Sequence, residues 1–181
     1  MGDASEQQLE DGFAEQIAAL AQAGADLISI ETMYDLREAL AALRAAVASG
    51  LGVLCSMTFE PRKRGVFTMM GDPLIPSLRA LHQAGATVVG YNCTVSSETM
   101  LDIISRSACE LNAVPIAAQP NAGQPVITSD GVRYNASPQV FAEHLASMVR
   151  SGVRVVGGCC GTDDAFIRAA RSALASLDSP P

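Results

Sequence analysis

The sequence predicts an α/β protein in which helices cover a parallel sheet. Amphipathic segments alternate with short apolar runs along most of the chain, and several of these segments end at a glycine. The runs are apolar throughout instead of alternating with polar residues, which indicates strands buried on both faces, as in parallel sheets. Five such strands fit either an open doubly wound sheet or part of a barrel, and the pattern alone does not separate the two.

Four junctions between a helix and a strand share one pattern, a glycine followed directly by an apolar run. Glycine readily adopts the left-handed conformation that ends many helices. These glycines are Gly24, Gly50, Gly85 and Gly152, before strands expected over 25–30, 53–57, 87–91 and 153–156. At a fifth junction Asn112, which also tolerates this conformation, precedes a strand expected over 114–118.

Each expected helix begins at a residue that can accept hydrogen bonds from the free N–H groups of the first turn. The candidates are Asp11 or a residue near Ser5, Asp35, Asp72 before Pro73, Ser96 or Ser97, Ser137 and Thr162. Two connections, over 59–71 and 120–136, are longer than usual, and the second can form a hairpin around 129–131. Both follow the carboxyl ends of strands, where parallel α/β proteins place their sites.

Composition restricts the class of protein. A chain of 181 residues with 49% hydrophobic and 17% charged residues indicates one globular domain, over 1–181. A net charge of -7 argues against nucleic acid as a partner, and no apolar run approaches the length of a membrane span. Five cysteines and a polar start unlike a signal peptide favour the cytoplasm. No strand precedes a glycine-rich phosphate loop, which argues against a nucleotide-binding sheet.

Polar residues gather where the expected strands end. Because the carboxyl ends of parallel strands share one edge, we expect these side chains to converge there. They are Glu31, Thr32, Asn92, Cys93, Asn121, Cys159 and Cys160. Three thiolates suit Zn²⁺ and leave one tetrahedral position open, as in catalytic zinc sites. The sequence therefore predicts Cys93, Cys159 and Cys160 as metal ligands, whereas Cys55 and Cys109 are expected to be packing residues.

Four short motifs resemble the zinc-dependent homocysteine S-methyltransferase family. Residues 157–162 read Gly-Gly-Cys-Cys-Gly-Thr, the family's signature, and residues 90–93 match its Gly-x-Asn-Cys element. A Glu-Thr pair ends the first strand. Residues 120–123 read Pro-Asn-Ala-Gly, which is similar to the homocysteine domain of cobalamin-dependent methionine synthase. The resemblance covers about residues 13–174.

This resemblance implies a partial (β/α)₈ TIM barrel that holds strands four to eight, with the first three expected before Met1. It implies a methyltransferase that moves a methyl group to the sulfur of homocysteine, giving methionine, with Zn²⁺ on the three cysteines. Glu31 would bind the substrate ammonium group and Asn121 would lie near the zinc. Thr32 and Asn92 are weaker candidates for substrate contacts.

The methyl donor and the partners stay open in this interpretation. Methylcobalamin on a separate corrinoid module is the first candidate donor, and S-methylmethionine or a betaine is the alternative. An incomplete barrel would also need a chain that supplies the missing strands. The alternative to an enzyme is a non-catalytic zinc-binding fragment that pairs its open sheet edge with a partner.

Overall fold

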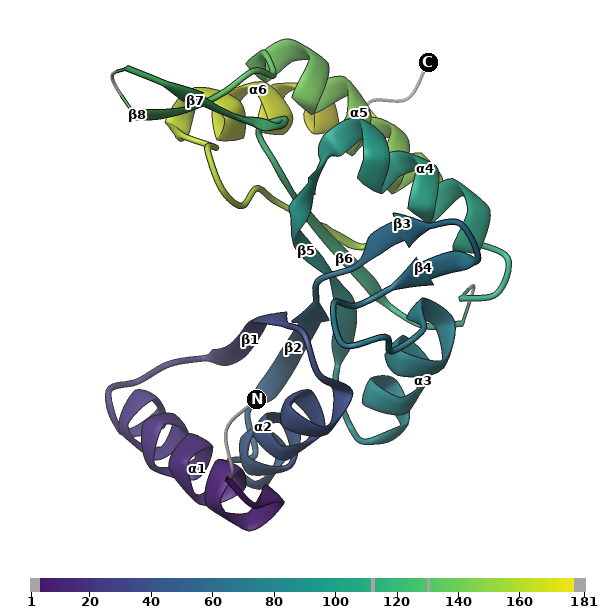
Figure 1. The fold of residues 1–181 in the computed structure, drawn as a ribbon. Coiled ribbons are helices and arrows are strands. Elements are labelled where there is room, and N and C mark those ends of the chain that lie inside the picture. Colours follow the sequence, from purple (N-terminus) through teal and green to yellow (C-terminus); the bar gives the residue numbers. More distant parts are fainter. Residues whose placement is uncertain (1–3, 112, 130, 178–181) are drawn as a thin grey trace. The chain divides into compact units, whose positions relative to one another are not determined.

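The computed structural model describes residues 4–111, 113–129 and 131–177, and helices and strands follow one another along most of the chain (Figure 1). The elements are α1 (Glu6–Gln22), β1 (Leu27–Met33), α2 (Leu36–Ala48), β2 (Gly52–Met57), β3 (Glu60–Arg62), β4 (Gly65–Phe67), α3 (Leu74–Gln83), β5 (Val88–Ser96), α4 (Ser97–Ser107), β6 (Ile116–Asn121), β7 (Pro125–Thr128), β8 (Gly131–Tyr134), α5 (Pro138–Arg150), β9 (Val155–Val156) and α6 (Asp164–Ala175). The turn expected at Asn112 lies outside the described residues.

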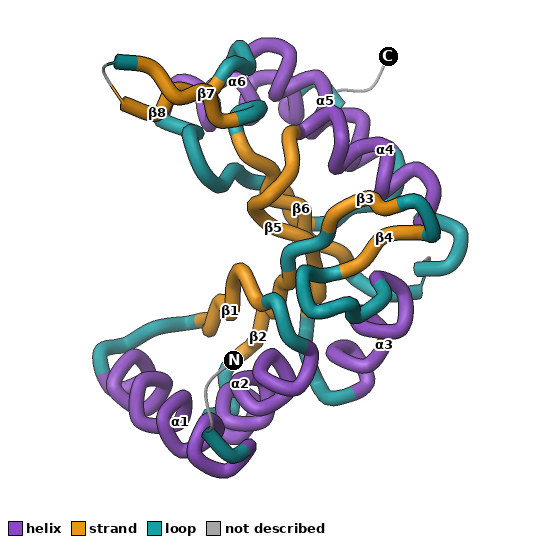
Figure 2. The backbone as a smooth tube through the Cα atoms, viewed as in Figure 1, coloured by secondary structure: helices purple, strands orange, loops and turns teal. Residues whose placement is uncertain are grey.

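Five strands form one sheet in the order β1-β2-β5-β6-β9. The pairs β1–β2 and β6–β9 are parallel, which confirms the predicted α/β fold with parallel strands. Each of the two long connections contains an antiparallel hairpin, β3–β4 in the first and β7–β8 in the second (Figure 2). The second hairpin was expected from the sequence and the first was not.

The chain divides into two compact units, residues 1–90 with 113–115, and residues 91–112 with 116–181. Strand β5 therefore begins in the first unit and ends in the second. The four glycines at the predicted junctions all have positive φ angles, between 77° and 108°, which confirms these helix ends. Within the described residues, no helix combines the length and the apolar character that crossing a bilayer requires.

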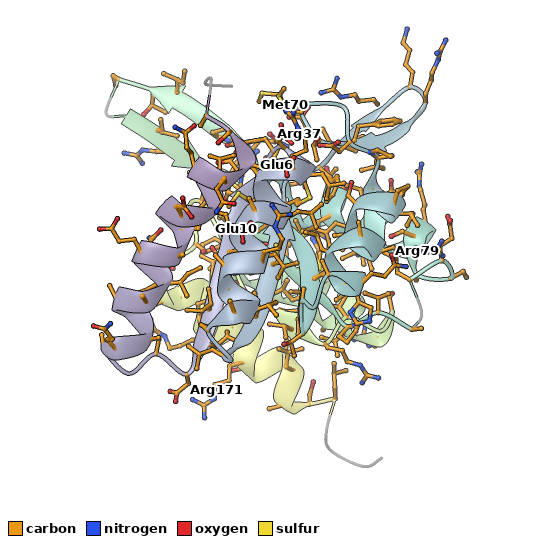
Figure 3. The ribbon with its side chains drawn as sticks, turned by 90° about the horizontal axis from the view of Figure 1, so that it is seen from below. Glu6, Glu10, Arg37, Met70, Arg79 and Arg171 are labelled. Atoms are coloured by element: carbon orange, nitrogen blue, oxygen red, sulfur yellow. The ribbon has the colours of Figure 1, made fainter. Side chains whose placement is uncertain are left out.

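In the first unit, α1 packs against α2, and α2 carries many of the buried side chains of this unit. Ala39, Ala42 and Leu43 of α2 have no exposed surface. Arg44 of α2 pairs with Glu10 at 2.7 Å and Glu6 at 3.6 Å. Both glutamates lie on α1 and are labelled in Figure 3. Because exposed ion pairs contribute little, burial of the apolar side chains holds the two helices together.

Two carboxylates, from distant positions in the sequence, bind the first N–H groups of α2. Asp35 accepts a hydrogen bond from the Arg37 N–H at 2.8 Å, as predicted. Asp72 was expected to cap its own helix, but its Oδ2 accepts from the Leu36 N–H at 3.0 Å, while Pro73 is the N-cap of α3. The prediction was wrong because the loop between β4 and α3 places the Asp72 carboxylate beside the start of α2.

Replacing Asp35 by alanine is expected to cost about 1–2 kcal/mol of stability, because α2 loses its N-cap. Burial would raise the pKa of Asp35, but hydrogen bonds and charge from Arg37 outweigh it and hold this pKa below its usual value. The stability from this carboxylate is therefore present above the unfolded pKa of about 3.9 and is lost as pH falls through the folded pKa. Urea unfolding at pH 7 and pH 3 should show the difference between wild type and variant shrinking in acid, whereas exposed Asp11→Asn should change little.

In the second unit, α4, α5 and α6 carry the larger core side chains. Phe141 of α5 has no exposed surface, and its ring meets that of Phe166 of α6 edge-on, with centroids 5.3 Å apart. Helix α6 begins after Asp163, whose Oδ1 accepts from the Ala165 and Phe166 N–H groups. Thr162 was predicted as this cap, but its hydroxyl donates to the Cys159 carbonyl at 2.7 Å and is thereby part of the preceding turn.

Candidate metal centre

Three cysteine sulfurs meet in the second unit. The Sγ atoms of Cys93, Cys159 and Cys160 all lie within 4.8 Å of one another, and those of Cys93 and Cys160 are 3.6 Å apart. Zinc–sulfur bonds of about 2.3 Å at tetrahedral angles separate two sulfurs by about 3.8 Å. The donor set and its spacing therefore fit a zinc ion, with three protein ligands and one position left over.

Cys93 lies in an unusual stretch of backbone near the end of β5. Both Cys93 and Thr94 are left-handed, with φ angles of 60° and 65°. This conformation is uncommon for residues with side chains and costs on the order of 1–3 kcal/mol for each. The preceding Asn92 is only 1% exposed, and its amide lies 4.0 Å from the Cys159 sulfur. The strained backbone therefore lies at the sulfur cluster itself.

The turn that carries Cys159 and Cys160 is bonded to the end of β6. The Cys159 N–H donates to the Pro120 carbonyl, and the Ala122 N–H donates to the Cys160 carbonyl, both at 2.9 Å. Between these bonds, Oδ1 of Asn121 accepts from the Cys160 N–H at 3.1 Å. Asn121 is 5% exposed, so its amide oxygen is occupied within the protein. These contacts explain how residues about 40 positions apart form one rigid turn.

Tyr134, at the end of β8, is a site residue that sequence reasoning missed. A Cβ atom on Gly161, where φ is 80°, would overlap Cγ of Tyr134, so the ring covers the backbone of this turn. Burial and a hydrogen bond with the Cys160 thiol raise the pKa of Tyr134. Tyr134 lies on the hairpin that follows β6 and not at the end of a main strand, so the pattern of strand ends does not reveal it.

Without a bound cation, burial and the neighbouring thiols oppose ionisation of Cys159. Burial, and then the neighbouring thiol of Cys93, raise the pKa of Cys159 to about 12. Adjacent thiolates repel one another, and a coordinated cation removes that repulsion. Metal binding at this cluster must therefore displace thiol protons, as it does at other thiolate sites.

The remaining predicted site residues and cysteines belong to other segments of the chain. Glu31 and Thr32 belong to the first unit, where a register shift between Ile30 and Met33 marks a bulge in β1, and Thr32 has a φ of 63°. Their role in substrate binding stays a prediction. Cys55 is fully buried in β2 as expected, but Cys109 is exposed beyond the end of α4, so its assignment as a packing residue was wrong.

Replacing Asn121 by alanine is expected to weaken zinc binding by about tenfold. The Cys160 N–H would lose its hydrogen-bond partner. Hydrogen bonds that hold metal ligands in place typically contribute 10–100-fold to metal affinity. Competition with a chromophoric chelator measures the change. Asn135, whose side chain accepts from Gln124 on the same connection, offers a control in Asn135→Ala. An Asn121→Ala affinity equal to wild type would show that backbone bonds alone hold the turn.

Solved structures with the same fold include homocysteine methyltransferase MmuM from Escherichia coli. Its apo form superposes with a TM-score of 0.74 at 24% identity, over 94% of this chain and 57% of that chain. Its oxidised form superposes with a TM-score of 0.69 at 23% identity. These similarities confirm the predicted fold, in which the strands and helices form part of a (β/α)₈ barrel.

Curated relatives are similar in sequence along almost the entire chain. Methionine synthase of Mycobacterium tuberculosis is 33% identical over 95% of this chain, and that of Mycobacterium leprae is 30% identical over 97%. The chain spans only 15% of the length of either relative. The family model described as homocysteine S-methyltransferase matches residues 1–174. The chain therefore belongs to the homocysteine S-methyltransferase family.

Proposed function

We propose that this chain is a homocysteine S-methyltransferase domain that forms methionine, with Zn²⁺ held by Cys93, Cys159 and Cys160. The observation that supports this most is the group of three sulfurs within 4.8 Å, in a chain of this family. A reaction in the cytoplasm is consistent with these cysteines, since none of the five is in a disulfide in the structure.

Methyl transfer to a thiol needs that thiol as its thiolate, and a free thiol has a pKa of about 8.5. Zinc on three thiolates would supply this activation, because a coordinated thiol loses its proton at neutral pH. In the transfer itself, the homocysteine sulfur forms a bond to the methyl carbon. The bond between that carbon and the donor breaks, and its electron pair leaves with the donor.

The chain's own residues bind and orient the reactants in this proposal. Asn121 holds the Cys160 turn, and Asn92 lies beside Cys159. Glu31, an exposed carboxylate on β1, binds the ammonium group of homocysteine, and Thr32 lies beside it in the bulge. Bulges frequently reorient side chains next to active sites, which supports these two assignments.

The donor we favour is methylcobalamin carried on a separate module, because the relatives at 30–33% identity are methionine synthases. S-methylmethionine and betaine are the alternatives, since a neighbour in structure is named a homocysteine methyltransferase. The test incubates zinc-loaded protein with homocysteine and each methyl-deuterated donor, and mass spectrometry detects labelled methionine. Label from methylcobalamin alone supports the first choice. Labelled methionine from another donor would identify that donor in place of methylcobalamin.

The alternative of a non-catalytic zinc-binding fragment makes a different prediction in the same assay. It binds zinc, but yields no labelled methionine with any donor, alone or with added partner chains. Cys93→Ser is the control for background methylation. Label that appears equally with this variant would contradict the role of the sulfur cluster, because the variant lacks one of the three thiolates.

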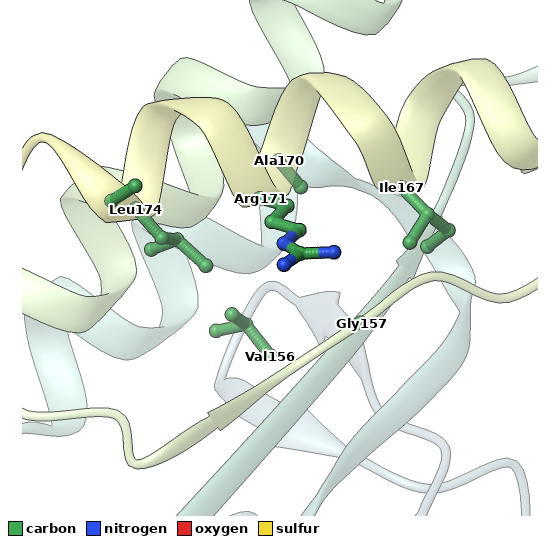
Figure 4. Close-up of a pocket in the computed structure, with 7 residues that line it drawn as sticks. Val156, Gly157, Ile167, Ala170, Arg171 and Leu174 are labelled. Carbon is green, nitrogen blue, oxygen red and sulfur yellow. The ribbon is translucent and has the colours of Figure 1, made fainter.

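An open groove in the second unit is evidence that a further segment packs against it. It has a volume of about 370 Å³ between β9 and α6, and its walls are mainly apolar (Figure 4). Its lining includes Val156, Ile167 and Leu174, and Ile167 is 49% exposed. Among the described strands, β9 pairs only with β6. We therefore propose that another strand–helix unit of the same barrel, from a longer protein or a second chain, occupies this groove.

Coexpression tests this occupant directly. The residues that directly precede the matched segment of the Mycobacterium tuberculosis methionine synthase, which is 33% identical over that segment, serve as the added chain. Light scattering after size-exclusion chromatography should show a one-to-one complex. Ile167→Asp should abolish it, whereas Ile127→Asp, at a position that is 87% exposed on β7, should not. Equal effects of the two substitutions would place the contact elsewhere.

A further inference from the structure

The strained pair Cys93–Thr94 lies close to the start of α4. Only Val95 and Ser96 separate it from the first residue of that helix. Left-handed residues with side chains persist only where their surroundings hold the backbone in place. Buried Asn92 does so on one side, so the start of α4 is the nearest support on the other. A contact that fixes this helix start would also fix the Cys93 backbone.

The first residue of α4 makes such a contact. Ser97 is 2% exposed, and its Oγ lies 2.9 Å from Nδ1 of His144 on α5. Helix α5 is a firm anchor, because its neighbouring residues Phe141 and Leu145 have no exposed surface. The hydrogen bond therefore joins the beginning of α4 to the middle of a helix that is packed into the core.

We propose that Ser97 and His144 are positioning residues, whose hydrogen bond holds the Cys93 sulfur at the metal centre. Neither residue is one of the three ligands, and both act through the backbone from 93 to 97. The sequence patterns that predicted the ligands do not reveal this pair, because 47 residues separate its members. This inference rests on the proposed function, since it assumes that the three sulfurs bind a metal.

The zinc affinity of variants of the two residues tests the pair. Ser97→Ala and His144→Leu should each weaken binding by about tenfold, and the double variant should be little worse than either. His144→Asn keeps a polar atom near the Nδ1 position and should stay within about threefold of wild type. Ser105→Ala is the matched control on α4, because its hydroxyl bonds only its own helix at Leu101. Urea midpoints check that each variant is folded.

A substitution in the strained pair distinguishes positioning from general stability. Thr94→Gly favours the left-handed backbone at that position, so it should recover much of the affinity that Ser97→Ala loses. A loss of packing alone would not be recovered in this way. Equal zinc affinity in wild type, Ser97→Ala and His144→Leu would overturn the inference, and so would a His144→Asn that binds as weakly as His144→Leu.

A measurement without zinc separates failure of this inference from failure of the proposed function. Phenylarsine oxide bridges two nearby thiols, so in a Cys159→Ser background it reports on the approach of Cys93 to Cys160. Ser97→Ala should slow this bridging about tenfold. If wild type binds no zinc, the proposed function fails while the arsenical still tests the pair. Bridging unchanged by Ser97→Ala would overturn the positioning role.

Discussion

Cys93→Ser is expected to abolish stoichiometric zinc binding, with a loss of affinity greater than about 100-fold. Removal of a hydrogen-bond partner of a metal ligand typically lowers metal affinity 10–100-fold. This substitution removes one of the three proposed thiolate ligands themselves. Serine keeps nearly the same size, and Cys93 is only half-buried, so the metal-free protein should remain folded. Zinc content of anaerobically purified protein, measured by atomic emission, gives the result.

The control for this experiment is a cysteine away from the cluster. Cys109 is exposed and lies beyond α4, so Cys109→Ser should retain one zinc per chain. Full zinc occupancy in Cys93→Ser would show that Cys159 and Cys160 bind metal with some other third ligand. In that case the 3.6 Å approach of the Cys93 and Cys160 sulfurs would have no role in coordination.

Gly161→Ala is expected to destabilise the protein by about 2–5 kcal/mol and to disrupt the metal centre. A left-handed alanine costs about 1–2 kcal/mol, and overpacking against a ring adds about 1–3 kcal/mol. The φ angle of 80° and the overlap of a new Cβ with the Tyr134 ring impose both costs at one position. Urea unfolding measures the first effect and zinc titration the second.

Two further variants separate these costs. Gly152 also has a positive φ, of 101°, but nothing lies within 4 Å of a Cβ built there, so Gly152→Ala should show only the backbone cost. Adding Tyr134→Ala to Gly161→Ala should remove the overpacking and leave the backbone strain. If Gly161→Ala were no worse than Gly152→Ala, Tyr134 would yield easily and would not hold the turn.

Local patterns in the sequence predicted the fold well, because each pattern has a local physical cause. A glycine directly after an amphipathic segment can adopt the left-handed backbone that ends a helix, so Gly24 and Gly152 marked true junctions. Likewise, the three cysteines were correctly predicted to meet, because parallel strands bring their carboxyl ends together. The three sulfurs lie within 4.8 Å of one another, although 66 residues separate Cys93 from Cys159.

Features that depend on contacts between distant segments could not be predicted in the same way. Asp72 has the sequence context of a cap for α3, yet a neighbouring loop brings its carboxylate to α2. Tyr134 and the Ser97–His144 pair follow from the way that hairpins and helices pack. No period or motif encodes such contacts, because they are formed by side chains on separate elements.

The close approach of Cys93 and Cys160 also makes the site sensitive to oxidation. Their sulfurs lie 3.6 Å apart, so forming a disulfide would require them to move about 1.5 Å closer. Loss of two electrons from this pair to an oxidant would remove two of the three proposed zinc ligands at once. An oxidant and a metal ion therefore compete for the same sulfurs. Exposure of the protein to air then determines whether a disulfide form or a metal-binding form is measured.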